Sequence, residues 1–290
     1  MWFFWSLGNA FTDSLKDVFG AKGSRKFDEY LVCFAQRFFA LPVLLPLAFI
    51  FELKVEPDVL FWKATAMSII INIPASILYY RALKESSLSL ALPVVTLSPV
   101  FLLVTSPLIN REVPSMLGVL GVMISVLGTY LLSLSERREG GFFAPLTVLW
   151  ENPGMRLMLI VAFLWSFGAP FDRIAVTHAD PFFYNAVKET TLAAVFFFVV
   201  IVRGGLRNLF HAKAAKILAP MGLLSGISIT FQMIAFSLTL VPYAISVKRA
   251  SALFGILWGK LYFGETNLKE RFVGAIVILA GAVMILLSTL

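Results

Sequence analysis

The sequence has few of the residues from which catalytic and metal sites are built. It contains one cysteine, Cys33, so an intramolecular disulfide and a thiolate metal cluster are both excluded. Its two histidines, His178 and His211, lie too far apart in the chain to indicate a metal site. No glycine-rich loop is followed by the Lys and Ser or Thr that bind phosphates in nucleotide-driven pumps. We therefore expect no enzyme activity, no metal and no cofactor.

Charged residues are also scarce. Only 14% of the 290 residues are charged, 59% are hydrophobic, and the mean hydropathy is +0.87. A soluble domain of this size cannot bury so much apolar surface in one core. The net charge of +7 is weak evidence for nucleic acid, because most Lys and Arg fall in short loops between apolar runs. The composition predicts an integral membrane protein that contacts lipid and binds no nucleic acid.

Apolar segments of about 20 residues, the length that crosses roughly 30 Å of hydrocarbon, recur along the chain. Because unpaired backbone polar groups are not tolerated in lipid, these segments are predicted to be helices. The ten candidate spans lie near residues 1–20, 29–51, 61–83, 87–108, 114–134, 154–175, 181–203, 216–239, 242–263 and 269–289. The first is the least convincing, because Asp13, Lys16 and Asp17 crowd its second half. No basic leader precedes it, so we expect it to stay in the mature protein.

The chain repeats itself. Identical residues at an offset of 153 are Ala82 with Ala235, Ser98 with Ser251, Glu112 with Glu265, Gly121 with Gly274 and Gly128 with Gly281. The pattern Trp-Ser-x-Gly-x-x-Phe over residues 5–11 recurs over residues 165–171. The repeated glycines are two helical turns apart in each copy, which predicts a smooth stripe where helices approach closely.

This duplication predicts an all-α membrane protein of ten transmembrane helices. We expect a first five-helix repeat over 1–134, a polar linker over 135–153 and a second five-helix repeat over 154–290. An odd number of spans makes the second copy enter the membrane in the opposite sense, as in alternating-access carriers with a central site. The fourth span is expected to be kinked or loosened by its prolines, Pro93, Pro99 and Pro107.

The ninth span carries two adjacent cations, Lys248 and Arg249, near its first third. A cation at this depth costs about 2.5 to 3.5 kcal/mol on insertion scales. A guanidinium offers a flat fork for two oxygens and an ammonium a compact charge, so the pair suits phosphate or carboxylate. The equivalent positions of the first half are Val95 and Thr96, and this asymmetry favours a ligand over a structural need. We predict that Lys248 and Arg249 bind an anionic group.

The alternative for this pair is an ion pair with an intramembrane carboxylate, such as Glu189 or Asp172. Two adjacent pairs, Lys188 with Glu189 and Asp172 with Arg173, lie near span ends and are interpreted as local interfacial pairs, although Lys188 is also a candidate for binding substrate. Arg37 is a lone charge in the second span, for which we expect a structural role facing the bundle.

Polar and aromatic residues inside the spans can line a pathway with hydrogen-bonding edges and ring faces, or can anchor the protein at the headgroups. Tyr80 is one such residue. The residues that we predict to bind substrate are Lys248, Arg249, Tyr243, Lys188, Asn72, Tyr79, Trp165 and Gln232.

The ten spans, the five-plus-five repeat and the apolar run ending in Phe263-Gly264-Glu265 resemble the drug/metabolite transporter superfamily, specifically its EamA-like members. The resemblance implies a secondary carrier. The stretch Ser246-Val247-Lys248-Arg249 is also similar to a segment of the plastid phosphate translocators, where an adjacent Lys-Arg pair on the ninth helix grips the substrate phosphate. Superfamily membership does not fix the cargo.

We therefore expect an alternating-access secondary carrier for a small organic anion, such as a phosphorylated metabolite, in the cytoplasmic membrane of a bacterium or archaeon. One alternative is an exporter of amino acids or amphipathic metabolites, and another is a flippase for a phosphate-bearing lipid. A homodimer is left open. The odd-numbered loops hold 15 basic residues and the even-numbered loops 4, which places both termini outside. The family resemblance implies cytoplasmic termini, so the orientation also stays open.

Overall fold

The computed structural model describes residues 1–51, 56–86, 94–134, 151–204, 212–251, 253–254 and 268–289. This part of the chain is all-α, as predicted. Its helices are α1 (Trp2–Lys26), α2 (Glu29–Phe38), α3 (Leu41–Ile50), α4 (Val59–Glu85), α6 (Ser98–Asn110), α7 (Met116–Leu134), α9 (Pro153–Thr177), α10 (Pro181–Val202), α11 (Ala212–Leu238), α12 (Val241–Lys248) and α14 (Leu268–Leu287).

Helices α9 and α10 begin where a capping residue is followed by proline. The Asn152 side chain accepts a hydrogen bond from the Met155 N–H at 3.1 Å, and the Asp180 side chain accepts one from the Phe182 N–H at 2.8 Å. Each cap satisfies a backbone donor that has no partner inside the helix. The proline in the first turn needs no such partner, because it has no N–H. Local sequence thus fixes both helix starts.

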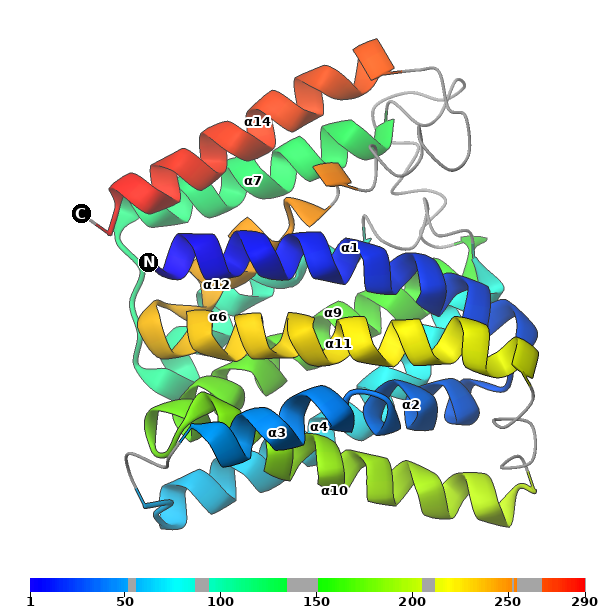
Figure 1. Ribbon diagram of the computed structural model, residues 1–290. Coiled ribbons are helices and arrows are strands. Elements are labelled where there is room, and N and C mark those ends of the chain that lie inside the picture. Colours follow the sequence, from blue (N-terminus) through cyan, green and yellow to red (C-terminus); the bar gives the residue numbers. More distant parts are fainter. Residues whose placement is uncertain are drawn as a thin grey trace.

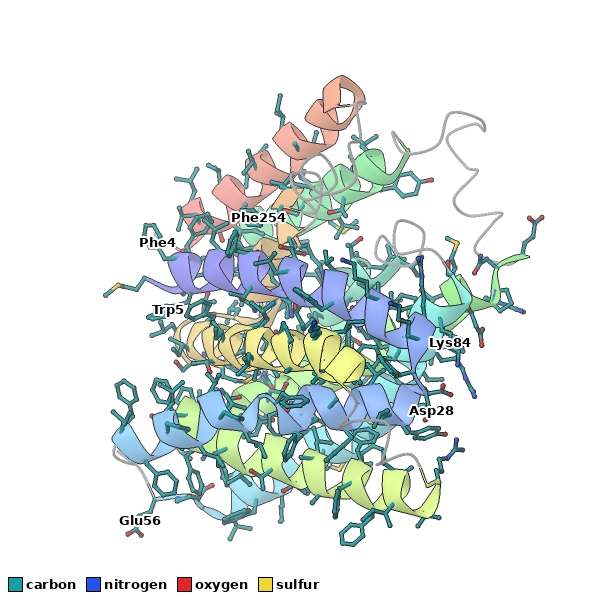
Figure 2. The ribbon with its side chains drawn as sticks, turned by 45° about the vertical axis from the view of Figure 1, so that its right-hand side comes forward. Phe4, Trp5, Asp28, Glu56, Lys84 and Phe254 are labelled. Carbon is teal, nitrogen blue, oxygen red and sulfur yellow. The ribbon has the colours of Figure 1, made fainter. Side chains whose placement is uncertain are left out.

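Five described helical segments are long and apolar enough to cross a membrane: Glu29–Ile50, Val59–Glu85, Pro153–Thr177, Pro181–Val202 and Ala214–Leu238. The first of these consists of α2 and α3 with a turn between them. The outer surface carries exposed phenylalanines such as Phe4 and Phe49, which are 74% and 85% exposed. In Figure 2 the charged residues Asp28 and Lys84 lie at one end of the bundle and Glu56 at the other. An apolar girdle with charges at its ends suits a lipid surround.

Two predicted spans contain helix ends inside the bundle. Helix α6 begins only at Ser98, with Pro99 in its first turn, in agreement with a loosened fourth span. Helix α12 has only eight residues and ends at Lys248, so the interpretation of residues 242–263 as a continuous helix is wrong at Arg249, where the backbone turns. The rest of that span, from residue 255 on, lies outside the described residues.

Helix packing is related between the two halves. Helix α1 packs along α11, and α4 packs along α9. Exchanging the halves converts one pair into the other, because α1 and α4 correspond to α9 and α11. Three further contacts each join a helix to its own counterpart in the other half: α2 with α10, α6 with α12 and α7 with α14. In Figure 1, α7 and α14 lie side by side and run in opposite directions, and both termini lie at the same end. The packing supports a duplicated architecture.

The repeated glycines lie where α7 and α14 meet. A methyl group on Gly121 would lie 2.8 Å from the carbonyl oxygen of Gly281, and one on Gly128 would lie 2.5 Å from the backbone nitrogen of Ile278. Both distances are too short for a real side chain. The prediction that these glycines allow close helix packing is confirmed.

Candidate functional site

A polar cavity of about 130 Å³ lies in the centre of the bundle and is lined by α1, α2, α4, α6, α9, α10, α11 and α12. A single water needs only about 10–15 Å³ by this kind of measure, so the cavity has room for a small organic molecule. The charged residues of its lining are Asp13, Lys16, Asp17, Arg37, Asp172, Lys188, Glu189, Lys248 and Arg249. Nine charged side chains of the described residues line it in the middle of an apolar bundle, which makes the cavity the candidate functional site.

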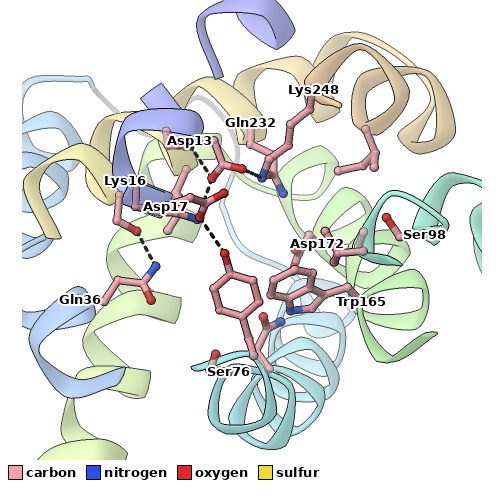
Figure 3. Close-up of a pocket in the computed structure, with 18 of the residues that line it drawn as sticks. Asp13, Lys16, Asp17, Gln36, Ser76, Ser98, Trp165, Asp172, Gln232 and Lys248 are labelled. Atoms are coloured by element: carbon pink, nitrogen blue, oxygen red, sulfur yellow. Dashed lines mark hydrogen bonds and ion pairs between the residues drawn. The ribbon is translucent and has the colours of Figure 1, made fainter. Parts of the chain in front are cut away.

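Asp13 of α1 joins a cation of its own helix to one from the second half. The Lys16 ammonium lies 2.7 Å from Asp13 Oδ1, and the Lys248 ammonium lies 3.3 Å from Asp13 Oδ2. Lys248 also donates a hydrogen bond to Gln232 Oε1 at 2.8 Å. Figure 3 shows Asp13 and Gln232 close to Lys248. The charge of Lys248 is therefore compensated inside the protein.

Asp17 lies one turn further along α1, beside an aromatic wall. The Tyr79 hydroxyl donates to Asp17 Oδ1 at 2.7 Å, and the Lys16 ammonium lies 3.1 Å from the same oxygen. The ring of Tyr79 packs against that of Trp165, with the two ring centroids 5.2 Å apart. A carboxylate and two aromatic rings thus form one side of the cavity.

The charged residues of α9 and α10 do not form the expected interfacial pairs. Lys188 and Glu189 are only 5% and 1% exposed. Lys188 lies 2.8 Å from Asp172 Oδ1, and Glu189 Oε2 lies 2.8 Å from Nη1 of Arg37. The prediction of a local Lys188–Glu189 pair is wrong, because neighbouring helical residues point about 100° apart and cannot face each other.

The interpretation of Asp172 and Arg173 as a local pair is wrong for the same reason. Arg173 points away from the cavity, and its Nε lies 2.9 Å from Glu112 Oε1. Asp172 is buried and, besides Lys188, accepts hydrogen bonds from Ser68 and Tyr184. Asp172 and Glu189 therefore pair with Lys188 and Arg37, and they are not the acids that compensate the cations of the ninth span.

Arg249 differs from the other cations of the cavity. Its Nη2 donates to the Ser98 hydroxyl at 2.6 Å, and this is its one hydrogen bond in the part of the chain that the structure describes. The Nε atom is buried without a partner. The side chain is 8% exposed, and no described carboxylate lies within ion-pair distance. Among the described residues, the positive charge of Arg249 therefore has no carboxylate in direct contact.

The structure brings most of the predicted site residues together. Those that line the cavity are Asn72, Tyr79, Trp165, Lys188, Gln232, Lys248 and Arg249, together with Tyr80. Tyr243 does not line it. Its hydroxyl accepts a hydrogen bond from the Ser115 N–H at 3.0 Å, and its ring packs on Gly118. Its contacts are those of a residue that joins α12 to α7. Arg37 faces the bundle as predicted, although it also lines the cavity.

Sequence reasoning missed the charges of α1. The crowding of Asp13, Lys16 and Asp17 makes the first predicted span the least convincing, yet all three side chains are at most 9% exposed inside the bundle. Their spacing of three and four residues was the available signal, because it places them on one helix face. Three charges on one face of an otherwise apolar helix indicate a polar interior.

The described residues contain no group of three or more His, Cys, Asp or Glu side chains arranged to hold a metal ion. In the charged lining, each carboxylate instead lies beside at least one cation. Such an arrangement can bind a small polar solute through ion pairs and hydrogen bonds. An apolar helical bundle around a buried polar cavity, with both halves contributing to its walls, is the architecture of a membrane transporter.

The family model of the EamA-like transporter family matches residues 1–134 and 152–287. The chain belongs to this family, which confirms the resemblance seen in the sequence. It is an integral multi-pass membrane protein that carries out secondary transport of small molecules, and the family is not enzymatic. A search of curated proteins found no match. A solved crystal structure that is 18% identical covers 99% of this chain and 96% of its own, with a TM-score of 0.73. At that identity the likeness shows the fold alone.

Proposed function

We propose that this chain is an alternating-access carrier for small organic anions, built from two inverted five-helix repeats over 1–134 and 154–290 with a linker over 135–153. The interchange of helix pairs between the halves and the opposite directions of α7 and α14 support this. The two matches of the family model, over 1–134 and 152–287, support a division of the chain near these boundaries. The site lies where the two repeats meet, which is where such carriers bind their cargo.

The observation that carries the anion proposal is the state of Arg249. A buried cation without a carboxylate is costly, and the binding of an anion would offset that cost. The guanidinium already uses one nitrogen on Ser98, and the remaining donors suit the oxygens of a carboxylate or phosphate. Lys248 lies next to it in the chain but is paired with Asp13, so the contact with the anion falls to Arg249.

The other lining residues fit the organic part of such a substrate. The ring faces of Trp165 and Tyr79 offer apolar contact, and the side chains of Gln232 and Asn72 offer hydrogen bonds. In the empty carrier the charge of Arg249 opposes movement of the site through the apolar barrier. Transport is therefore expected to run as an exchange of anions, with the protein in the cytoplasmic membrane of a bacterium or archaeon.

Counterflow into proteoliposomes tests this proposal, with a panel of phosphate esters, carboxylates and amino acids as internal and external solutes. The Arg249→Gln variant is expected to lose anion counterflow. The matched control is Arg203→Gln, because Arg203 is exposed and lies at a helix end away from the cavity. Anion counterflow that survives in folded Arg249→Gln protein would contradict the proposal.

A second candidate is an exporter of amphipathic metabolites or amino acids. Two observations favour it. Four cavity cations are paired with carboxylates of the protein itself, and the packed rings of Tyr79 and Trp165 form an aromatic side of the cavity. For such a substrate the aromatic faces dominate recognition. Trp165→Ala would then abolish counterflow of amphipathic solutes, whereas Arg249→Gln would change it little. The opposite ranking of the two variants supports the anion carrier.

A further inference from the structure

We infer that the cavity selects substrates with a single net negative charge. The inference rests on the proposed function, that of an anion carrier, and adds the charge state of the cargo. It follows from the balance of ionised side chains among the described residues around the cavity, and from the position of Arg249, which that balance leaves without a carboxylate partner.

The described lining holds five cations and four carboxylates. The cations are Lys16, Arg37, Lys188, Lys248 and Arg249, and the carboxylates are Asp13, Asp17, Asp172 and Glu189. With every group ionised, the lining carries one net positive charge.

The excess charge can be assigned to one residue. Each carboxylate has a cation within 3.3 Å: Lys16 and Lys248 for Asp13, Lys16 for Asp17, Lys188 for Asp172 and Arg37 for Glu189. Lys16 and Lys248 are held by the two aspartates of α1. No such partner is found for Arg249 among the described residues, and its Nη2 is bound to the neutral Ser98 hydroxyl.

Inside the membrane, the net charge of the cavity strongly affects which substrates bind. Charges interact strongly in a low-dielectric interior, and an uncompensated charge there is unfavourable. One negative charge on the substrate makes the loaded cavity neutral. A doubly charged anion leaves it negative, and a neutral solute leaves it positive. Both the affinity and the movement of the loaded site therefore favour a singly charged anion, such as a monocarboxylate or a phosphodiester.

Ser98 provides a way to change the balance beside Arg249. It is 2% exposed and begins α6, where an acidic side chain is favoured by the helix dipole. Ser98→Asp would give Arg249 its own carboxylate and make the empty lining neutral. Ser98→Asn introduces a side chain of the same size as aspartate but without its charge, so it is the matched control.

The experiment measures binding of two matched probe pairs to the purified full chain in lipid nanodiscs. The pairs are succinamate with succinate, and methyl phenyl phosphate with phenyl phosphate, at a pH where the second member of each pair is doubly charged. We expect the singly charged member to bind about tenfold or more tightly to the native protein and to Ser98→Asn. Ser98→Asp is expected to lose this binding.

A second variant tests the inference in the opposite direction, and remains available if Ser98→Asp fails to fold. Asp17→Asn removes one carboxylate and raises the net charge of the lining by one, so the doubly charged probes should become the tighter ligands. A native preference for the doubly charged probes, or a preference that stays the same in the folded variants, would overturn the inference and leave the anion carrier standing. Binding of neutral or zwitterionic solutes without any anionic probe would overturn both.

Discussion

Oδ2 of Asp13 lies 3.3 Å from the ammonium nitrogen of Lys248. This contact ties the first helix of the chain to the last residue of α12, so that the two halves meet at an ion pair inside the bundle. The same carboxylate also holds Lys16, at 2.7 Å. One aspartate thus compensates cations from both halves.

Asp13→Asn is expected to destabilise the protein by roughly 3–5 kcal/mol, because it leaves Lys248 buried without an acid. Removing the cation as well, in Asp13→Asn/Lys248→Gln, should recover part of that loss. The melting temperatures of the purified single and double variants measure the coupling between the two residues. Additive losses would show that the ion pair does not hold the halves together.

Tyr243 is expected to affect stability rather than substrate binding. Tyr243→Phe removes the hydrogen bond to the Ser115 N–H and should cost about 0.5–1.5 kcal/mol. Gly118→Ala should cost more, because the added methyl group would overlap the Tyr243 hydroxyl. Combining the two substitutions should not restore the melting temperature, because the ring carbons that Tyr243→Phe retains would still overlap the added methyl group. A weaker affinity for the transported anion in folded Tyr243→Phe would place Tyr243 in the site after all.

The contact between α7 and α14 depends on glycine. A methyl group on Gly281 would lie 2.6 Å from the carbonyl oxygen of Gly121 and would overlap the Ser125 hydroxyl, so Gly281→Ala should cost roughly 1–3 kcal/mol by overpacking. Leu279 is 52% exposed on the same helix and faces the lipid. Leu279→Ala should change the melting temperature little, because lipid solvates apolar side chains as well as protein does. Equal effects of the two variants would rule out this packing.

Asp58 links the start of α4 to the end of α9, outside the membrane spans. Its side chain accepts a hydrogen bond from the Phe61 N–H at 2.8 Å and lies 2.9 Å from Nδ1 of His178. The Phe61 hydrogen bond, reinforced by His178, holds the pKa of the Asp58 carboxyl below its ordinary value of 3.8.

Because the folded-state pKa is lowered, the stabilisation by Asp58 is present above the ordinary pKa and is lost as the pH falls through the lowered value. The Asp58→Asn variant keeps the helix cap without the titration. Melting temperatures measured down through the acidic range should therefore fall more steeply for the native protein than for Asp58→Asn. Parallel curves would show that this carboxylate does not contribute.

Hydropathy and the internal repeat were enough to predict the helical membrane fold and the family. They report how apolar each segment is, and lipid imposes the helix on such segments. They carry no information on contacts between distant helices, such as the bond from Arg249 to Ser98, and they did not predict that α12 ends at Lys248.

The site could be predicted only in part for the same kind of reason. The sequence shows the cations Lys248 and Arg249 as charges in an apolar run. Their partners depend on which helix faces line the cavity, and the sequence does not show this. The acid for Lys248 comes from α1, more than 200 residues away in the chain. A single sequence indicates how deep a charged residue lies in the membrane more readily than it indicates which residue pairs with that charge.

Binding of the transported molecule's negative charge by Arg249 is tested most directly by a structure of the carrier with a transported anion bound. We expect the anionic group in the central cavity, within hydrogen-bond distance of the Arg249 guanidinium, with Lys248 still paired with Asp13. An anion bound elsewhere, with Arg249 still paired only with Ser98, would contradict it.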